Sequence, residues 1–181
     1  EPKFSLETDK ADLVNKMKVK GSPENELLFS YKRYVDTRQA KIIELQKEPE
    51  KNKAEMTAIN DEIVAYREKF ISDNPQAFIA KVFNASREPE VPKDGPKGED
   101  GKISKTYQYQ YYKQHYLDGI DFSDERLLQT PVFQGRIKDY LNRVTVQSPD
   151  SIIASVDEII ALAEGNPEMF RYCVSTAMNM Y

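Results

Sequence analysis

Prolines stand at the expected starts of four helices in this chain. Their positions constrain the fold more than any other feature of the sequence. Three of the prolines follow a capping Ser or Asn, in the pairs Ser22-Pro23, Ser148-Pro149 and Asn166-Pro167. The fourth follows Thr130, which the proline pushes out of the helical region, so that one helix ends where the next begins. Proline suits a first helical turn because the amide hydrogens there have no intrahelical partner. The sequence therefore predicts a series of helices with sharply defined starts.

Two long apolar stripes follow the first of these starts. The first stripe comprises Leu28, Tyr31, Val35, Ile42 and Leu45, and the second comprises Met56, Ile59, Ile63, Tyr66 and Phe70. Both have the 3–4 spacing of a helix with one buried face, interrupted in the first stripe only by Arg38. We expect Pro49 to end the first helix near Glu48 and a short turn at 47–51 to reverse the chain. Residues 22–72 should thus form an antiparallel, coiled-coil-like hairpin.

The rest of the sequence predicts shorter helices before and after one long loop. Residues 74–144 should hold a short helix with Phe78, Ile79, Val82 and Phe83 on its apolar face, then the loop Arg87 to Gly101, which has three prolines and three glycines. We expect this loop to be mobile, since it offers little apolar area to bury. In the segment after Thr130, the residues Phe133, Ile137, Tyr140, Leu141 and Val144 share one helical face.

A second helical hairpin is predicted over 148–181. Its inward residues are expected to be Ile152, Ile153, Val156, Ile159, Ile160 and Ala163 in one helix, and Met169, Phe170, Cys173, Val174 and Ala177 in the other. Gly165 should cap the first of the two helices. Hydrophobic residues make up 39% of the chain and charged residues 31%, which fits long helices with one buried stripe.

The fold class predicted is therefore all-α, with antiparallel helical hairpins packed as an irregular bundle. Residues 1–21 form the exception, because Phe4, Leu6 and Val19 alternate with polar residues, as in one or two short strands or an extended arm. We expect residues 1–21 to be a linker arm or the end of a preceding β-rich domain, and 22–181 to be the helical domain. Glu1 and Tyr181 are expected to be boundaries within a longer protein.

The charge of the chain argues against nucleic acid as a partner, and its hydropathy argues against a transmembrane helix. The formal net charge is −4 and the isoelectric point is near 5.2, whereas nucleic-acid binding usually requires a basic patch. No stretch of 18 consecutive apolar residues occurs, so the sequence predicts no transmembrane helix.

A tyrosine-rich segment, from Thr106 to Tyr116, is the one candidate interaction surface. It holds five tyrosines: Tyr107, Tyr109, Tyr111, Tyr112 and Tyr116. They could form a stacking platform for a ligand such as a sugar or a base. Alternatively, they pack against neighbouring helices with their hydroxyls reaching water or backbone partners, which is the commoner role of tyrosines on a helix. The spacing places Tyr109, Tyr112 and Tyr116 on one face.

The residues of catalysis are missing from the sequence. Thiol-disulfide exchange needs an attacking and a resolving cysteine, and Cys173 is the only one, at an apolar helical position. His115 is the only histidine, so no zinc site can be assembled from His and Cys pairs. The acidic residues between Asp118 and Glu125 lack the spacing of a calcium loop and are better explained by helix capping. We predict no catalytic residue, no metal ligand and no cofactor.

One stretch has an order of residues specific enough to indicate a protein family. It reads Asp121-Phe-Ser-Asp-Glu-Arg-Leu-Leu-Gln-Thr-Pro-Val-Phe, and is followed by Ile137 to Leu141 and by Ser148-Pro-Asp-Ser-Ile-Ile. This pattern resembles a helical domain of unknown function in exported, TlpA-like thiol-disulfide oxidoreductases of Gram-negative gut bacteria. The likeness is best over 74–181 and weaker over 21–72.

The resemblance implies a context rather than a set of catalytic residues. In such proteins a β-rich domain precedes the helical domain, and a thioredoxin-like domain with the catalytic cysteines follows it. The expected function is a non-catalytic helical module, in the periplasm or at the envelope, that positions the redox domain or its protein thiol and disulfide substrates. The alternative is an independent module that binds an envelope protein or a ligand through the tyrosine-rich helix and the mobile loop.

Overall fold

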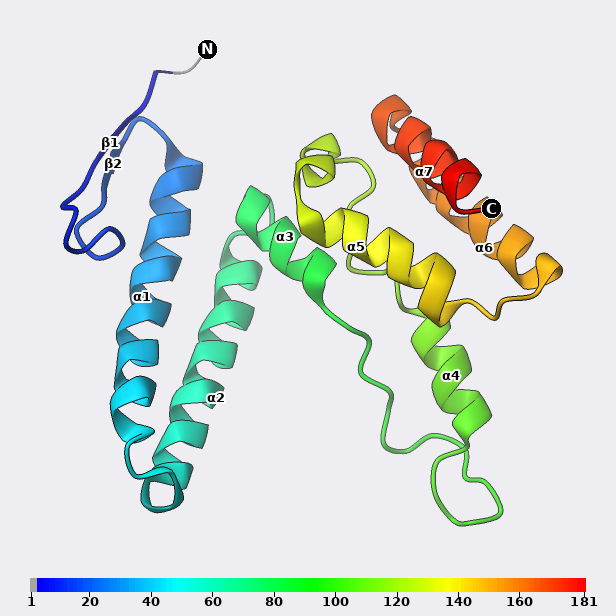
Figure 1. Ribbon diagram of the computed structural model, residues 1–181, viewed down its shortest axis with the longest axis horizontal. Helices are drawn as coiled ribbons and strands as arrows, with labels where there is room; N and C mark the ends of the chain where they lie inside the picture. The colour runs from blue at the N-terminus through cyan, green and yellow to red at the C-terminus, as the bar shows by residue number, and fades with distance from the viewer. Residues whose placement is uncertain (1–2) are drawn as a thin grey trace. The chain divides into compact units, whose positions relative to one another are not determined.

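The computed structural model describes residues 3–181, which divide into two compact units (Figure 1). The first unit extends to Ala80 and the second runs from Lys81 to Tyr181. Apart from a two-stranded sheet near the start of the chain, the regular structure is helical. The predicted mainly α fold class is therefore confirmed.

The first unit begins with a small antiparallel hairpin. Strand β1 (Ser5–Glu7) pairs with β2 (Lys18–Lys20), with Ser5 opposite Lys20. The prediction that the first twenty residues could form strands is confirmed. A two-stranded sheet is marginally stable by itself, and β2 packs against the helix that follows it.

Two long helices make up the rest of the first unit. Helix α1 (Pro23–Leu45) begins at the predicted cap, where the Ser22 side chain accepts a hydrogen bond from the amide of Asn25. Helix α2 (Pro49–Asp73) runs back along it, so the predicted hairpin is confirmed (Figure 1). Pro49 is the first residue of α2 and lies outside the turn, which is shorter than predicted because proline needs no amide hydrogen there.

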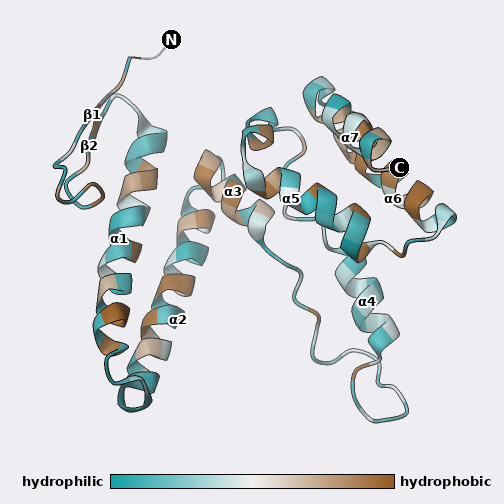
Figure 2. Cartoon of the chain, in the orientation of Figure 1, coloured by the Kyte–Doolittle hydropathy of each residue, from teal (hydrophilic) through white to brown (hydrophobic). Residues whose placement is uncertain are grey.

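Stacked rings form much of the seam between α1 and α2. The ring of Tyr34 lies 3.5 Å from that of Tyr66, and the guanidinium of Arg38 lies 3.3 Å from the Tyr34 ring centre. Arg38 also pairs with Glu62 at 3.1 Å. The residue that interrupts the apolar stripe therefore joins the seam through a cation–π contact. In Figure 2, apolar and polar segments alternate along both helices, as expected for helices with one buried side.

The second unit contains the remaining helices. Helix α3 (Phe78–Ser86) crosses from the first unit into it, and is followed by α4 (Lys105–Gln114), the 3-10 helix η1 (Glu125–Gln129), α5 (Pro131–Asp139), the π-helical turn η2 (Tyr140–Val144), α6 (Pro149–Ala163) and α7 (Pro167–Met180). Helices α6 and α7 lie side by side, so the second predicted hairpin is also confirmed (Figure 1).

The core of the second unit is centred on α5 and η2. The face predicted after Thr130 is buried in full: Phe133, Ile137, Tyr140 and Leu141 have no exposed area, and Val144 has 8%. At η2 the helix widens, and the amide of Thr145 donates to the carbonyl of Tyr140 at 2.9 Å. A π-turn inserts one extra residue per turn, and such turns are frequent at functional sites.

Some local predictions need correction. In α3 the predicted apolar residues Phe78, Ile79, Val82 and Phe83 are half-buried, and the fully covered residues are alanines such as Ala85. In the C-terminal hairpin Ile153 is 59% exposed and Phe170 is 40% exposed, because the covered face of each helix is narrower than its apolar stripe. Gly165 directly follows Glu164, the C-cap of α6, but its φ is not positive, so it does not form the left-handed cap that was predicted.

Candidate functional site

The tyrosine-rich segment forms most of α4, with Tyr116 in the turn that follows it, and its five tyrosines have different surroundings. Tyr116 is buried, with its ring 5.8 Å from that of Tyr140, and the Arg136 guanidinium covers it at 3.6 Å. Tyr112 packs against Tyr116 at 5.4 Å. Burial raises the pKa of both phenols. These two tyrosines are part of the core rather than a platform for a ligand.

Tyr107 and Tyr111 lie beside the segment predicted to be mobile. A methyl group added to Gly95 would come within 2.3 Å of the Tyr107 ring, so the ring lies directly on the loop backbone. Tyr111 lies between Tyr107 and His115, with ring centres 6.0 Å and 4.2 Å away. The structure thus brings α4 and the loop together through Tyr107, while the mobility of the loop stays a prediction.

Tyr109 lines a hollow in the second unit. It is 38% exposed, and its hydroxyl donates to the carbonyl of Val144 at 3.0 Å, which fixes the orientation of the ring. The hollow has a volume of about 440 Å³, within the range of small-molecule pockets. It is lined by Tyr109, Gln110, Lys113, Gln114, Tyr140, Val146, Ser151 and Glu158.

A network of hydroxyl groups around Lys113 forms the floor of this hollow. The Lys113 ammonium lies 2.6 Å from the Ser155 hydroxyl and 3.2 Å from the Tyr140 hydroxyl, and Tyr140 in turn donates to Glu158. Thr145 donates to Ser155 at 2.9 Å. Burial lowers the pKa of Lys113, because desolvation disfavours its charged form.

Binding, rather than covalent catalysis, is the chemistry that this network supports. A Ser–Lys pair at 2.6 Å has the spacing of an activated nucleophile. However, Ser155 has no exposed area, so a substrate cannot reach its oxygen. What remains accessible is one fixed aromatic ring, the amides of Gln110 and Gln114, and the carboxylate of Glu158. Ser155 and Glu158 could not be singled out from the sequence, since both lie on a helix that was recognised only by its apolar stripe.

The stretch from Asp121 to Phe133, which carries the family resemblance, contains a second cluster of polar side chains. Its contacts stabilise the fold. Lys81 lies 2.8 Å from Asp121 and 2.9 Å from Asp124, and Arg126 contacts Asp124 at 2.6 Å. These cations lower the pKa of the Asp124 carboxyl, and Asp121 and Asp124 raise the pKa of Lys81. Among residues 3–181, no group of three or more His, Cys, Asp or Glu is arranged to hold a metal ion.

The position of Ser123 before Leu127 and Leu128 predicts that it caps a helix. This prediction is wrong, because Asp124 caps η1 and its carboxylate accepts a hydrogen bond from the amide of Arg126 at 3.2 Å. The Ser123 amide instead donates to Asp121 at 3.0 Å. One side chain therefore caps a helix and pairs with two cations, which explains the acidic residues between Asp118 and Glu125 without a ligand.

Cys173 and His115 show no arrangement for catalysis. Cys173 has no exposed area, and burial raises the pKa of its thiol to about 11. His115 contacts Asp118 at 2.6 Å on the surface of the same turn. A protonated, enclosed thiol is a poor nucleophile, because the thiolate is the reactive form.

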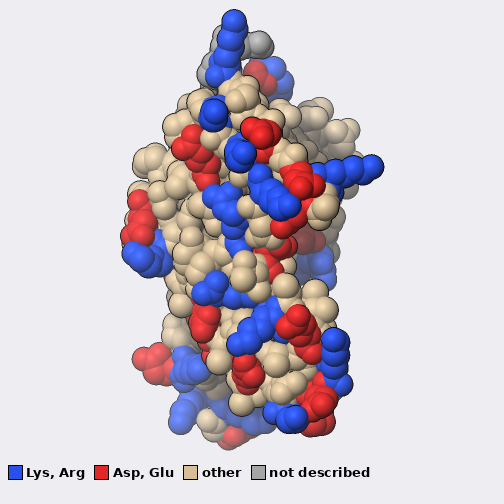
Figure 3. Space-filling model, turned by 90° about the vertical axis from the view of Figure 1, so that its left-hand side faces the viewer, with Lys and Arg blue, Asp and Glu red and all other residues tan. Residues whose placement is uncertain are grey.

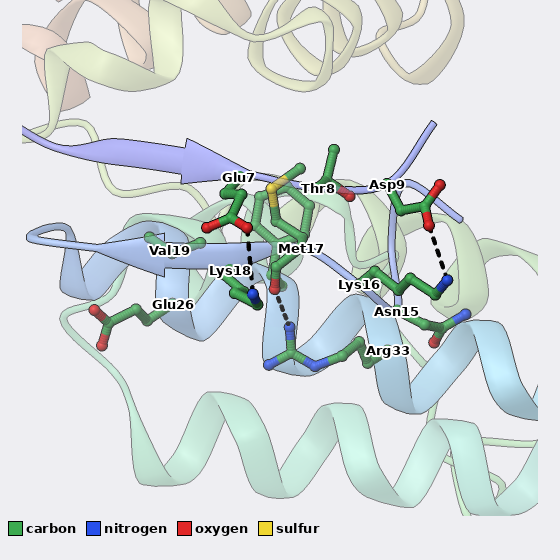
Figure 4. A pocket seen from close by; sticks show the side chains of 11 residues that line it. Glu7, Thr8, Asp9, Asn15, Lys16, Met17, Lys18, Val19, Glu26 and Arg33 are labelled. Atoms are coloured by element: carbon green, nitrogen blue, oxygen red, sulfur yellow. Dashed lines mark hydrogen bonds and ion pairs between the residues drawn. The ribbon is translucent and has the colours of Figure 1, made fainter. Parts of the chain in front are cut away.

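A groove of about 770 Å³ lies between the β-hairpin and α1 in the first unit (Figure 4). Its charges face one another: Lys18 pairs with Glu7 at 3.3 Å, and Lys16 pairs with Asp9 at 2.9 Å. Arg33 donates to the carbonyl of Met17 at 3.3 Å. The two ion pairs lie within the hairpin, and the Arg33 hydrogen bond joins the hairpin to α1. On the face shown in Figure 3, basic and acidic side chains are intermixed, so this face has no single-sign patch of the kind that binds nucleic acid.

The class of protein that these features define is a mainly helical domain with two hairpins. The chain belongs to the family described as Domain of unknown function (DUF5106), whose family model matches residues 39–181. Neither the curated proteins nor the solved structures include a significant match to the chain. No helix in the described residues is long and apolar enough to cross a membrane.

Proposed function

We propose that this chain is the non-catalytic helical module of an exported, TlpA-like thiol-disulfide oxidoreductase. The observation that carries the proposal is the state of Cys173, which is the only cysteine, fully buried and protonated. Thiol-disulfide exchange needs an exposed attacking thiolate and a second, resolving cysteine. In the proposed function, the exchange chemistry belongs to another part of the protein and the helical module positions it.

Family membership and the resemblance support this context. The matched range 39–181 includes the motif from Asp121 to Phe133, which resembles the domain that precedes a thioredoxin-like domain. In the structure this motif is packed into the second unit, with Asp124 ion-paired and Phe133 buried, as suits a scaffold. The proposal places the module in the periplasm or at the envelope, where the redox domain acts on protein thiols and disulfides.

The experiment compares the longer protein with the same protein lacking residues 22–181. If the module positions the redox domain, its removal should lower kcat/KM for a protein disulfide such as insulin and leave the rate on a small disulfide unchanged. A longer protein without a Cys-x-x-Cys pair would contradict the proposal. Equal rates on insulin with and without the module would contradict the positioning role.

A second candidate function is a ligand-binding module, favoured by the hollow beside Tyr109. The fixed Tyr109 ring, the two glutamine amides and Glu158 suit a neutral, hydroxyl-rich ligand such as a sugar. A panel of soluble oligosaccharides, tested by thermal shift, should contain a stabilising member if this function is correct. Tyr109→Ala should abolish that shift, whereas Tyr181→Ala, another exposed tyrosine, should retain it.

A further inference from the structure

Strand β1 has a neighbouring strand on only one of its two edges within residues 3–181. The sheet there has two strands, and β1 pairs with β2 through Ser5 opposite Lys20 and Glu7 opposite Lys18. The strand that packs against α1 is β2, and all three residues of β1 are exposed. The second edge of β1 therefore presents backbone N–H and C=O groups that are unpaired among the described residues, and such an edge is a template for a further strand.

The two sides of β1 differ in character, because side chains alternate along a strand. Phe4 and Leu6 lie on one side, where they are 53% and 48% exposed. The other side carries Lys3 and Glu7, which have opposite charges, with Ser5 between them. A strand that pairs with this edge must therefore offer apolar side chains on one side and matching charges on the other.

The backbone of Lys3 and Phe4 continues this edge before the first residue of β1. A methyl group on Gly21, which directly follows β2, would lie 3.0 Å from the carbonyl oxygen of Lys3 and 3.7 Å from the Cα atom of Phe4. The chain before β1 thus runs alongside Gly21, as the register of the hairpin predicts. Because glycine has no side chain, the Phe4 ring meets no cross-strand side chain at this position, and it has room for one from another strand.

The sequence of β1 is complementary to itself in one antiparallel register. When Ser5 lies opposite Ser5 of a second copy, Phe4 lies opposite Leu6 and Lys3 lies opposite Glu7. A two-fold axis repeats both of these pairs. Apolar pairs and pairs of opposite charge between neighbouring strands stabilise a sheet.

Other arrangements of two such strands lose this match. A shift of one residue sets Phe4 opposite Ser5 and turns the apolar side of one strand to the polar side of the other. Parallel pairing sets Lys3 beside Lys3 and Glu7 beside Glu7, and like charges across a sheet are destabilising.

We infer that the free edge of β1 is a self-association surface, at which two copies of this chain form a four-stranded antiparallel sheet in the order β2–β1–β1–β2. The inference goes beyond the proposed function and does not depend on it. In this sheet Glu7 lies between Lys18 of its own hairpin and Lys3 of the second copy, so the charges alternate. Strands this short bury less than the roughly 800 Å² per partner of stable complexes, so the dimer should dissociate on dilution.

Sedimentation equilibrium of residues 1–181 tests the inference. The average mass should rise from the monomer value of 20.9 kDa towards twice that value as the protein concentration increases. The series should extend to about 1 mM, where even a weak contact is populated. Amide hydrogen exchange at positions 5–7 should slow over the same series, because pairing engages the backbone of β1. A monomer at every concentration would overturn the inference.

Two charge-reversal variants test the register. Lys3→Glu and Glu7→Lys should each abolish the dimer, because each places like charges opposite one another at both ends of the paired strands. An equimolar mixture of the two variants should restore it, since every pair in the mixed dimer again joins opposite charges. The Glu7–Lys18 ion pair is exposed, with 73% and 67% of the side chains accessible, so its loss should cost the hairpin little.

The matched control is Lys10→Glu, which makes the same change of charge at an exposed position outside β1 and should leave the average mass at the wild-type value. A dimer that survives both charge reversals would overturn the inference, because association would then use another surface. A mixture of the two variants that stays monomeric would also overturn it, because the proposed register requires that mixture to pair.

Discussion

Lys81 and Asp124 lie 43 positions apart in the sequence, and their ammonium and carboxylate groups are 2.9 Å apart in the structure. The Asp124 side chain is 8% exposed and that of Lys81 is 16% exposed. This ion pair therefore joins α3 to the start of η1, at a place that is largely shielded from solvent. Removing one partner of such a pair is costly, since the other charge is left partly buried.

Asp124→Asn should reduce the free energy of unfolding at pH 7 by about 3 kcal/mol, on the scale expected for a broken buried ion pair. The Arg126 and Lys81 cations lower the pKa of Asp124, so its stabilisation is present above the unfolded pKa of about 3.9 and is lost as the pH falls through the folded value. Urea titrations at pH 7 and pH 3 should thus show a smaller difference between wild type and variant at pH 3.

The control is Asp139→Asn, because Asp139 pairs with Arg143 at 3.5 Å on the surface. It should cost less than about 1 kcal/mol, as exposed pairs usually do. Equal losses for the two variants would show that the Asp124 cluster has no special role.

Gly119 and Gly135 form a matched pair for backbone packing. A methyl group on Gly119 would lie 2.3 Å from the carbonyl oxygen of Asn84, whereas a methyl group on Gly135 meets nothing within 4 Å. Gly119→Ala should therefore destabilise the chain by about 2–3 kcal/mol through overpacking. Gly135→Ala, inside α5, should stabilise it by about 0.5–1 kcal/mol through helix propensity. Thermal unfolding distinguishes the two, and a stabilising Gly119→Ala would contradict the close approach to Asn84.

Truncation of Ile59 and of Ile63 tests how deeply each side chain is buried between α1 and α2. Ile59 is 5% exposed and Ile63 is half-buried, although both belong to one predicted stripe. Ile59→Ala should cost about 2–5 kcal/mol, the range for a buried isoleucine. Ile63→Ala should cost about 1–2 kcal/mol, because less apolar area is lost. Chemical denaturation measures both, and a larger loss at position 63 would mean that the seam is centred elsewhere.

The spacing of apolar residues and the positions of prolines predicted the helices well, because both signals come from residues close together in the sequence. The face from Phe133 to Val144 is buried as its spacing indicated, and α1, α6 and α7 begin at the predicted prolines. The contacts made by Lys81 could not be predicted, since they join residues distant in sequence. Ser155 was missed because a serine in an apolar stripe gives no sign of burial, and its lysine partner lies on another helix.

Cys173 should be unreactive in the native chain. Burial raises the pKa of its thiol to about 11, so the thiol is protonated at pH 8 and is also enclosed. Labelling with a disulfide reagent at pH 8 should be negligible in buffer and complete in guanidinium chloride. The raised pKa also means that its contribution to stability is present below the unfolded pKa of about 8.5 and is lost as the pH rises toward 11. Rapid native labelling would contradict the burial of this residue.

The central claim is that this module carries no redox chemistry of its own, and insulin reduction tests it most directly. Residues 1–181 and their Cys173→Ser variant should both reduce insulin at the background rate, since one thiol cannot resolve a mixed disulfide. If the proposed function is correct, a longer protein that carries a Cys-x-x-Cys pair should reduce insulin with turnover, and should lose that activity when the pair is changed to serines. Turnover by residues 1–181 above the Cys173→Ser background would contradict the claim.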